Sequence, residues 1–84
     1  MDNKYKYNPE EFKGILGLSD ELSNFYRLHE IYNEDKTRSN WFNLEKHWED
    51  LFFTIKHRML EGYINRATAE DLNKYMEDLL YVWF

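Results

Sequence analysis

The stretch from Trp41 to Glu61 constrains the fold most, because it runs for 21 residues without Gly or Pro. These two residue types are the strongest interruptions of a helix, so the sequence predicts one long central helix here. An apolar stripe recurs along it at steps of three and four residues, at Trp41, Leu44, Trp48, Leu51 and Ile55. That spacing keeps the stripe on one face of a helix.

A second apolar line on the same stretch consists of Phe42, Phe53 and Leu60, and it lies on another side of the predicted helix. We expect one of the two faces to pack against the preceding helix and the other against the last helix. This places the helix in the middle of the fold and assigns its aromatic side chains to the core.

The N-terminal third is predicted to contain two helices after a loose terminus at residues 1–7, for which a short edge strand is the alternative. Asn8 followed by Pro9 is typical of a helix start, and a helix of about two turns is expected to end near Gly17. Ser19 is predicted to cap a second helix that stops near Asn33. Its broad apolar face consists of Leu22, Phe25, Tyr26, Leu28, His29, Ile31 and Tyr32.

Residues 34–39 are polar and lack periodicity, so they are predicted to form a loop, after which Ser39 or Asn40 caps the central helix. Gly62 is expected to end that helix in the left-handed conformation of a Schellman motif. Thr68 is predicted to cap the last helix. The apolar positions of that helix are Leu72, Tyr75, Met76, Leu79, Leu80 and Trp83. The sequence therefore predicts a single all-α domain over residues 1–84, a small bundle of three to four antiparallel helices.

Composition excludes several classes of protein. The chain has 84 residues, no Cys and a net charge of −5, and 19% of its residues are aromatic. A disulfide scaffold and a thiolate nucleophile are excluded, and large aromatic side chains can supply the core of so small a domain. The N-terminus has no apolar signal region and no apolar run reaches a membrane-spanning length. We therefore expect a soluble cytoplasmic protein that does not contact a membrane.

The sequence contains no pattern typical of a catalytic, metal or cofactor site. His47 and His57 are ten residues apart, which turns them about 80° from each other on one helix and separates them by about 15 Å. His29 falls on an apolar helix face and is interpreted as a core or boundary residue. Adjacent acidic pairs do not converge on a helix, and no Gly-rich phosphate loop or nucleophile elbow is present. We expect no enzyme activity, no cofactor and no metal.

Charge varies along the chain. Residues 36–58 carry five basic and three acidic residues, whereas both flanking segments are acidic. The basic clusters near Lys36 and Lys56, with Trp41 nearby, leave open a nucleic-acid contact or a small helix-turn-helix regulator. The net negative charge argues against direct nucleic-acid binding.

The stretch GYINRATAEDL, residues 62–72, resembles the hairpin of a helix, a Gly and a capped helix found in many small bacterial helical domains. The overall composition resembles that of accessory proteins of phages and mobile elements from low-GC bacteria. These resemblances identify no particular family and imply no activity.

The leading functional prediction is a non-enzymatic acidic protein that binds a larger protein with a basic surface in a fixed stoichiometry. Its narrower form is an anti-CRISPR-like inhibitor, from a phage or mobile element, of a nuclease or other nucleic-acid-handling protein, acting through nucleic-acid mimicry. The alternative is a homo-oligomeric, structural or regulatory protein. The residues predicted to contact a partner combine carboxylates with aromatic side chains expected to be exposed. They are Tyr32, Glu34, Asp35, Tyr63, Glu70, Asp71, Glu77, Asp78, Tyr81 and Trp83, with Phe84 beside them.

Overall fold

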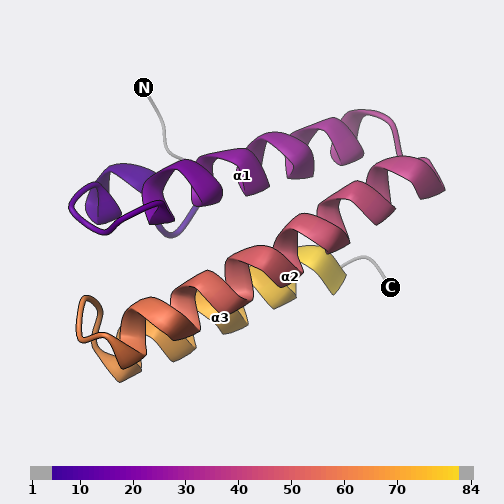
Figure 1. Cartoon of the computed structure of the whole chain (residues 1–84). Coiled ribbons are helices and arrows are strands. Elements are labelled where there is room, and N and C mark those ends of the chain that lie inside the picture. The colour runs from indigo at the N-terminus through magenta and orange to yellow at the C-terminus, as the bar shows by residue number, and fades with distance from the viewer. Residues whose placement is uncertain (1–4, 82–84) are drawn as a thin grey trace.

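The computed structural model describes residues 5–81 as one short 3-10 helix and three α-helices. These are η1 (Pro9–Phe12), α1 (Leu18–Glu34), α2 (Arg38–Leu60) and α3 (Arg66–Tyr81). Each α-helix runs antiparallel to the one before it, with α2 lying between α1 and α3 in the chain and contacting both (Figure 1). The described residues contain no strand, and the predicted all-α bundle around a long central helix is confirmed.

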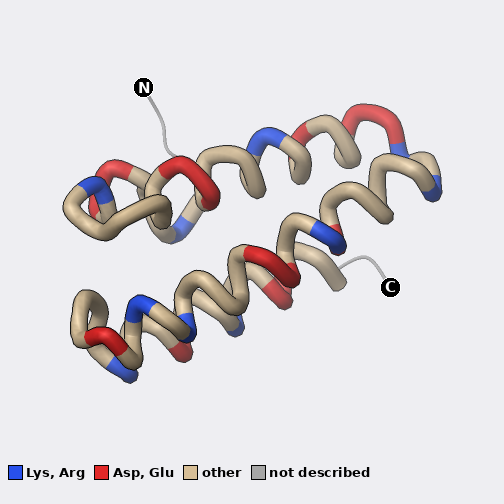
Figure 2. The backbone as a smooth tube through the Cα atoms, viewed as in Figure 1, with Lys and Arg blue, Asp and Glu red and all other residues tan. Residues whose placement is uncertain are grey.

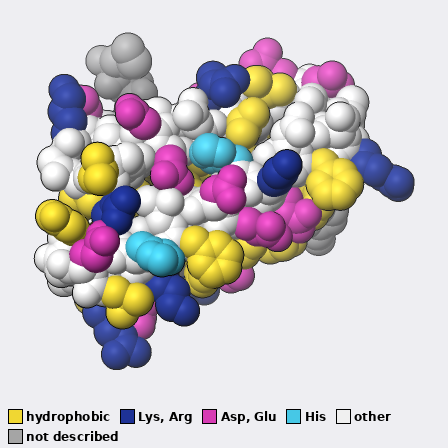
Figure 3. Space-filling view, in the orientation of Figure 1, with side chains coloured by type: hydrophobic (Ala, Val, Ile, Leu, Met, Phe, Trp, Pro, Cys, Tyr) yellow, Lys and Arg dark blue, Asp and Glu magenta, His cyan; other side chains and the backbone are white. Residues whose placement is uncertain are grey.

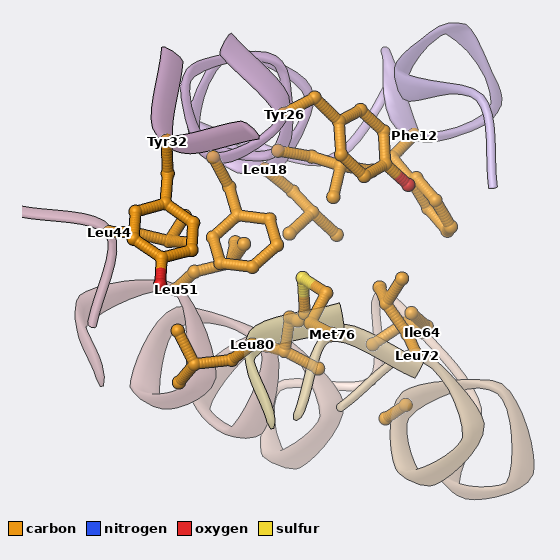
Figure 4. Packing of buried hydrophobic residues seen from close by; sticks show 14 residues of the cluster. Phe12, Leu18, Tyr26, Tyr32, Leu44, Leu51, Ile64, Leu72, Met76 and Leu80 are labelled. Atoms are coloured by element: carbon orange, nitrogen blue, oxygen red, sulfur yellow. The ribbon is translucent and has the colours of Figure 1, made fainter. Parts of the chain in front are cut away.

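The core lies where the three helices face one another (Figure 4). Nine of its side chains have no exposed surface: Leu18, Leu22, Phe25, Leu44, Leu51, Ile55, Leu72, Met76 and Leu80. Burying a Leu, Ile, Met or Phe side chain stabilises a fold by roughly 1.5–3 kcal/mol. The predicted stripe of α2 is confirmed, because Leu44, Leu51 and Ile55 are buried and the two Trp residues on it pack against the cluster.

The second apolar line of α2 does not pack against α3, so the sequence prediction was wrong there. Phe42, Phe53 and Leu60 have 62%, 57% and 72% of their surface exposed. Each of them is nine residues from a buried Leu of the same helix. Nine residues turn an α-helix by about 900°, which is half a turn beyond two full turns. Because α1 and α3 both cover the Leu side, this second line points to solvent.

The end of α2 forms the predicted Schellman motif. Gly62 adopts a left-handed φ of 89°. Its N–H donates to the carbonyl of Met59 at 3.0 Å, and the N–H of Tyr63 donates to the carbonyl of Arg58 at 2.9 Å. Ile64 then turns inward and is buried, which fixes the connection to α3.

The helix starts differ from the predictions. Gly17, at φ 76°, precedes α1 in place of a Ser19 cap. Thr37 caps α2 instead of Ser39 or Asn40, accepting a hydrogen bond from the Asn40 N–H at 3.1 Å. The Asn65 side chain, not Thr68, caps α3 by accepting from the Thr68 N–H at 2.8 Å. In each case the residue that precedes the helix lies two or three positions before the predicted cap, and at Gly17 no side chain caps the helix.

Asn8 caps as predicted, but the structure that follows is only the single turn of η1. A capping box joins Asn8 to Glu11, and the two-turn helix expected up to Gly17 is not formed. Gly14 interrupts this segment, in agreement with its poor helix propensity.

The residues just before Asn8 are ordered against the bundle, so the loose terminus predicted for residues 1–7 was wrong for the part that the structure describes. We call Tyr5, Lys6 and Tyr7 the strap. The Tyr5 ring stacks on Tyr26 of α1 with centroids 3.8 Å apart, and its hydroxyl hydrogen-bonds to His29 Nδ1 at 3.0 Å. Residues 1–4 lie outside the described residues.

The strap also reaches α3. The backbone N–H of Lys6 donates to the Tyr75 hydroxyl at 2.8 Å, and its Nζ lies 2.8 Å from Asp71 Oδ2. Tyr7 donates its hydroxyl proton to Asp71, and its ring packs edge-on against Tyr75. The strap therefore fastens α1 to α3.

Candidate protein-binding surface

An open groove of about 1030 Å³ runs between α2 and α3 on the side of the bundle away from the strap contacts. Its apolar lining comes from α2, from the connection and from the start of α3: Trp48, Phe52, Met59, Leu60, Ile64 and Ala69. The small side chain of Ala69 leaves room beside the large side chains of α2. Apolar clefts of 300–1,000 Å³ are typical of binding sites in proteins.

Aromatic rings connect the groove to the outer face of α2. The Trp48 and Phe52 centroids are 5.8 Å apart, and the Phe52 and Phe53 centroids are 5.6 Å apart in an edge-to-face contact. We call the exposed residues Phe42, Phe53, Leu60 and Tyr63 the ridge; Leu60 borders the groove as well. Hydrophobic side chains lie among charged ones on this face of the molecule (Figure 3).

The ridge was not predicted to be a surface, although the sequence contains a signal for it. Three of the four ridge residues are nine positions from Leu44 or Leu51, which belong to the predicted core stripe of α2. A residue at that spacing lies on the opposite side of the helix. Two large apolar faces half a turn apart cannot both be covered when the neighbouring helices pack on one side.

The rim of the groove carries both signs of charge. Lys56, Arg66 and Lys74 are the basic residues, and Glu70 and Glu77 are the acidic ones. Arg66 Nε lies 2.8 Å from Glu70 Oε2, and this hydrogen bond raises the pKa of the guanidinium. Glu70 is thus occupied by a neighbour one turn away, whereas Glu77 lies further along the groove toward Trp48.

Two buried polar atoms beside the groove have no hydrogen-bond partner among residues 5–81. They are Trp48 Nε1 and Asn73 Oδ1, and both residues line the groove. A buried polar group without a partner costs about 1–3 kcal/mol. On the strap side, by contrast, the hydroxyl groups of Tyr5, Tyr7 and Tyr26 are all hydrogen-bonded.

The acidic row predicted on α3 does not form one surface. Asp71 accepts hydrogen bonds from Lys6 and Tyr7, which hold the pKa of its carboxyl below the usual value. Glu70 pairs with Arg66. Glu77 borders the groove, and Asp78 is exposed on the next position of the helix. Only Glu77 and Asp78 of the row therefore remain as carboxylates with no internal ion pair among the described residues.

The other predicted contact residues are dispersed. Glu34 and Asp35 are exposed at the connection between α1 and α2, at the opposite end of the molecule from the Gly62 turn (Figure 1). Tyr63 and Tyr81 are exposed by 61% and 43%, as expected. Trp83 and Phe84 lie outside the described residues.

Tyr32 was predicted to be exposed, and this prediction was wrong. Only 9% of its surface is exposed, and it belongs to the core cluster. Tyr32 is seven residues from the fully buried Phe25, so two helical turns bring it back to the same inward face.

The three His residues occupy unrelated places. His29 is buried beside Tyr5, His47 Nε2 contacts the carbonyl of Glu21 at 3.0 Å, and His57 is exposed. Within residues 5–81 no group of three or more His, Asp or Glu side chains is placed to hold a metal ion.

No helix of the described chain has the length and apolar character needed to cross a membrane. No family model, no curated protein and no solved structure matches this chain.

Proposed function

We propose that the protein acts by binding another protein in a fixed stoichiometry, without catalysis, and that the α2–α3 groove is the contact site. The observation that carries the proposal is the apolar groove, bordered by exposed Leu60, in a chain of only 84 residues. Concave sites lined mainly by apolar side chains, with a few polar groups at the rim, are typical of binding sites.

The rim carries Lys56, Arg66 and Lys74 as well as acidic residues, but the carboxylates near its Trp48 end favour a partner with basic residues at that end. Figure 2 shows acidic positions on both α2 and α3. Glu49 and Asp50 are exposed and follow the groove residue Trp48, and exposed Asp78 follows the groove residue Glu77. The net charge of −5 adds a long-range attraction for a basic surface. Such complementarity raises the association rate and selects among partners.

The narrower form of the proposal is inhibition of a nuclease or another nucleic-acid-handling protein, in the manner of an anti-CRISPR protein of a phage or mobile element. Its support is the charge pattern. Because Glu70 and Asp71 are engaged within the chain, mimicry of a phosphate backbone would depend on Glu77 and Asp78 with Glu49 and Asp50.

The experiment is affinity capture of partners on the immobilised protein at low and high salt, followed by measurement of stoichiometry and affinity. Reversing the groove-side pair with Glu77→Lys and Asp78→Lys is expected to weaken binding by about tenfold at low salt. Reversing the distant pair with Glu34→Lys and Asp35→Lys is the matched control and should change affinity much less. Equal effects of the two reversals would contradict the groove as the contact site.

Competition with nucleic acid tests the narrower form of the proposal, inhibition of a nucleic-acid-handling protein by mimicry. If the partner handles nucleic acid through the occupied surface, duplex DNA or RNA should release it from the immobilised protein. A partner that binds DNA and this protein simultaneously would exclude mimicry while leaving protein binding intact.

The helix-turn-helix alternative receives no support from the geometry. In that motif the two helices cross at about 90–120°, whereas α2 and α3 form a close antiparallel hairpin (Figure 1).

A further inference from the structure

The outer face of α2 has a sequence order that is complementary to itself. Phe42, Glu49, Lys56 and Tyr63 follow one another at intervals of seven residues. Residues seven apart fall on nearly the same side of an α-helix, with a drift of about 20° per interval. All four side chains are exposed. Phe42, Glu49 and Lys56 form one stripe along the solvent side of α2, and Tyr63 lies in the turn just after the helix.

When the order of these residues is reversed, each aromatic position falls on an aromatic position and each acidic position falls on a basic one. The order aromatic, acidic, basic, aromatic becomes aromatic, basic, acidic, aromatic. A second copy laid antiparallel on the first, about an axis midway between positions 52 and 53, therefore places Glu49 opposite Lys56 of that copy. Phe42 then lies about 16 Å from the axis at 1.5 Å per residue, near the turn of the other copy that carries Tyr63.

The neighbouring stripe of α2 fits the same arrangement. Phe53 lies within one residue of the axis and would pack on its own copy. Lys46 and Leu60 lie seven residues on either side of Phe53, so the aliphatic stem of Lys46 would cover Leu60 of the other copy. Antiparallel helix pairs use heptad stripes of this kind, with apolar residues at the centre and charges at the flanks.

We propose that this face of α2 is a self-association interface, in which two copies pair their α2 helices antiparallel about a two-fold axis near Phe53. The four ridge residues, each more than half exposed, would bury about 100–150 Å² apiece. Both copies with their charged flanks then reach the roughly 1,000 Å² at which specific interfaces begin. Because this area is at the lower limit for specific interfaces, we expect a weak dimer that dissociates on dilution. This inference does not require the groove to have a protein partner.

The test uses the full chain and a charge exchange between two variants, with mass measured by sedimentation over a concentration series. The wild-type protein should change from 10.5 kDa toward twice that mass as concentration rises. Glu49→Lys places Lys opposite Lys, and Lys56→Glu places Glu opposite Glu, so each variant is expected to dimerise at least about tenfold more weakly. An equimolar mixture of the two restores both Glu–Lys pairs and should form a heterodimer. Lys13→Glu, the same charge change at an exposed site on another part of the molecule, is the control and should dimerise like wild type.

Three results would overturn the proposal: a wild-type protein that stays monomeric up to about millimolar concentration, at which weak complexes form; single variants that dimerise as well as the control; or a mixture that forms no heterodimer. Circular dichroism of each variant confirms that the helices are retained. Partner capture by the groove is measured separately, with the Glu77→Lys and Asp78→Lys variant, which should still dimerise. Failure of one proposal is thereby distinguished from failure of the other.

Discussion

The seam between α1 and α3 and the seam between α2 and α3 use aromatic side chains in opposite ways. At the first, the strap covers the seam, and Tyr5 and Tyr7 pack against the bundle with their hydroxyls bonded. At the second, no segment among residues 5–81 covers the groove, and Phe53 and Leu60 are exposed beside it. A strap of three residues is enough to cover one seam with partly buried aromatic side chains. The open seam is thus the one available to another molecule.

The largest expected difference between the two sides is in unfolding free energy. Tyr26→Ala removes a ring that is 6% exposed and stacked on Tyr5. We expect a loss of about 3–5 kcal/mol in chemical denaturation, as for other large core truncations. Tyr26→Phe keeps the ring and loses only the hydrogen bond to the Tyr7 carbonyl, so about 1 kcal/mol is expected. If Tyr26→Ala cost no more than Phe53→Ala, the two seams would not differ.

Alkaline pH should weaken the strapped side. The hydrogen bond to Asp71, followed by burial, raises the pKa of Tyr7 from 10.0 to about 12. Burial and the charge of Glu30 raise the pKa of Tyr5 from 10.0 to about 12. A raised pKa in the folded state stabilises the fold fully below pH 10, and that contribution is lost as pH rises through 12.

The measurement is the urea midpoint between pH 9 and 12, with tyrosinate absorbance recorded in parallel. Tyr7→Phe should lower stability at neutral pH and make the alkaline decline shallower than in wild type. An unchanged decline in this variant would show that the strap contact does not carry the pH dependence.

The Gly62 turn connects α2 to α3 at one end of the groove. Substitution of Gly62 should lower the stability of the fold by an intermediate amount. At φ 89°, a side chain at this position is strained even though nothing lies within 4 Å of the added Cβ. Gly62→Ala is expected to cost about 1 kcal/mol or more. Gly14→Ala, equally uncrowded and without a positive φ, should be neutral or slightly stabilising. Equal thermal midpoints for the two variants would contradict strain at Gly62.

The smallest effect on stability is expected on the ridge. Phe53→Ser, measured in dilute protein, should change the unfolding free energy by no more than about 0.5 kcal/mol, because 57% of the ring is already exposed. The same variant should dimerise more weakly at high concentration. A loss of stability comparable to that of Tyr26→Ala would place Phe53 in the core and remove the distinction.

Local signals in the sequence predict most of the fold. The uninterrupted run over residues 41–61, the stripe through Leu44 and Leu51, and Gly62 each act within one or two helical turns. Helix caps are harder to place, since Thr37 and Asn65 compete with polar neighbours that could form the same hydrogen bond. The length of the first helical segment was overestimated, because Asn8 and Pro9 indicate where a helix starts but not how long it is.

The strap and the groove could not be predicted in this way. The contacts of the strap with α3 join residues separated by 64 to 69 positions, and three residues are too few to show periodicity. The groove depends on how closely α2 and α3 approach beside Ala69. The candidate carboxylates were found by residue type. The pairing of Asp71 with Lys6 depends on the position of the strap against α3, whereas the pair of Glu70 with Arg66 is a contact between residues four apart on one helix.

The strap has a consequence for the order of folding. Helical hairpins such as α1–α2 and α2–α3 close over short connections, whereas the contact between Lys6 and Asp71 must close a loop of more than 60 residues. Its sites on Tyr26 and Tyr75 come together only after both hairpins have formed. The strap therefore belongs to the last step of folding, and weakening it should speed unfolding while leaving the folding rate almost unchanged. Tyr5, Lys6 and Tyr7 therefore slow the unfolding of the bundle.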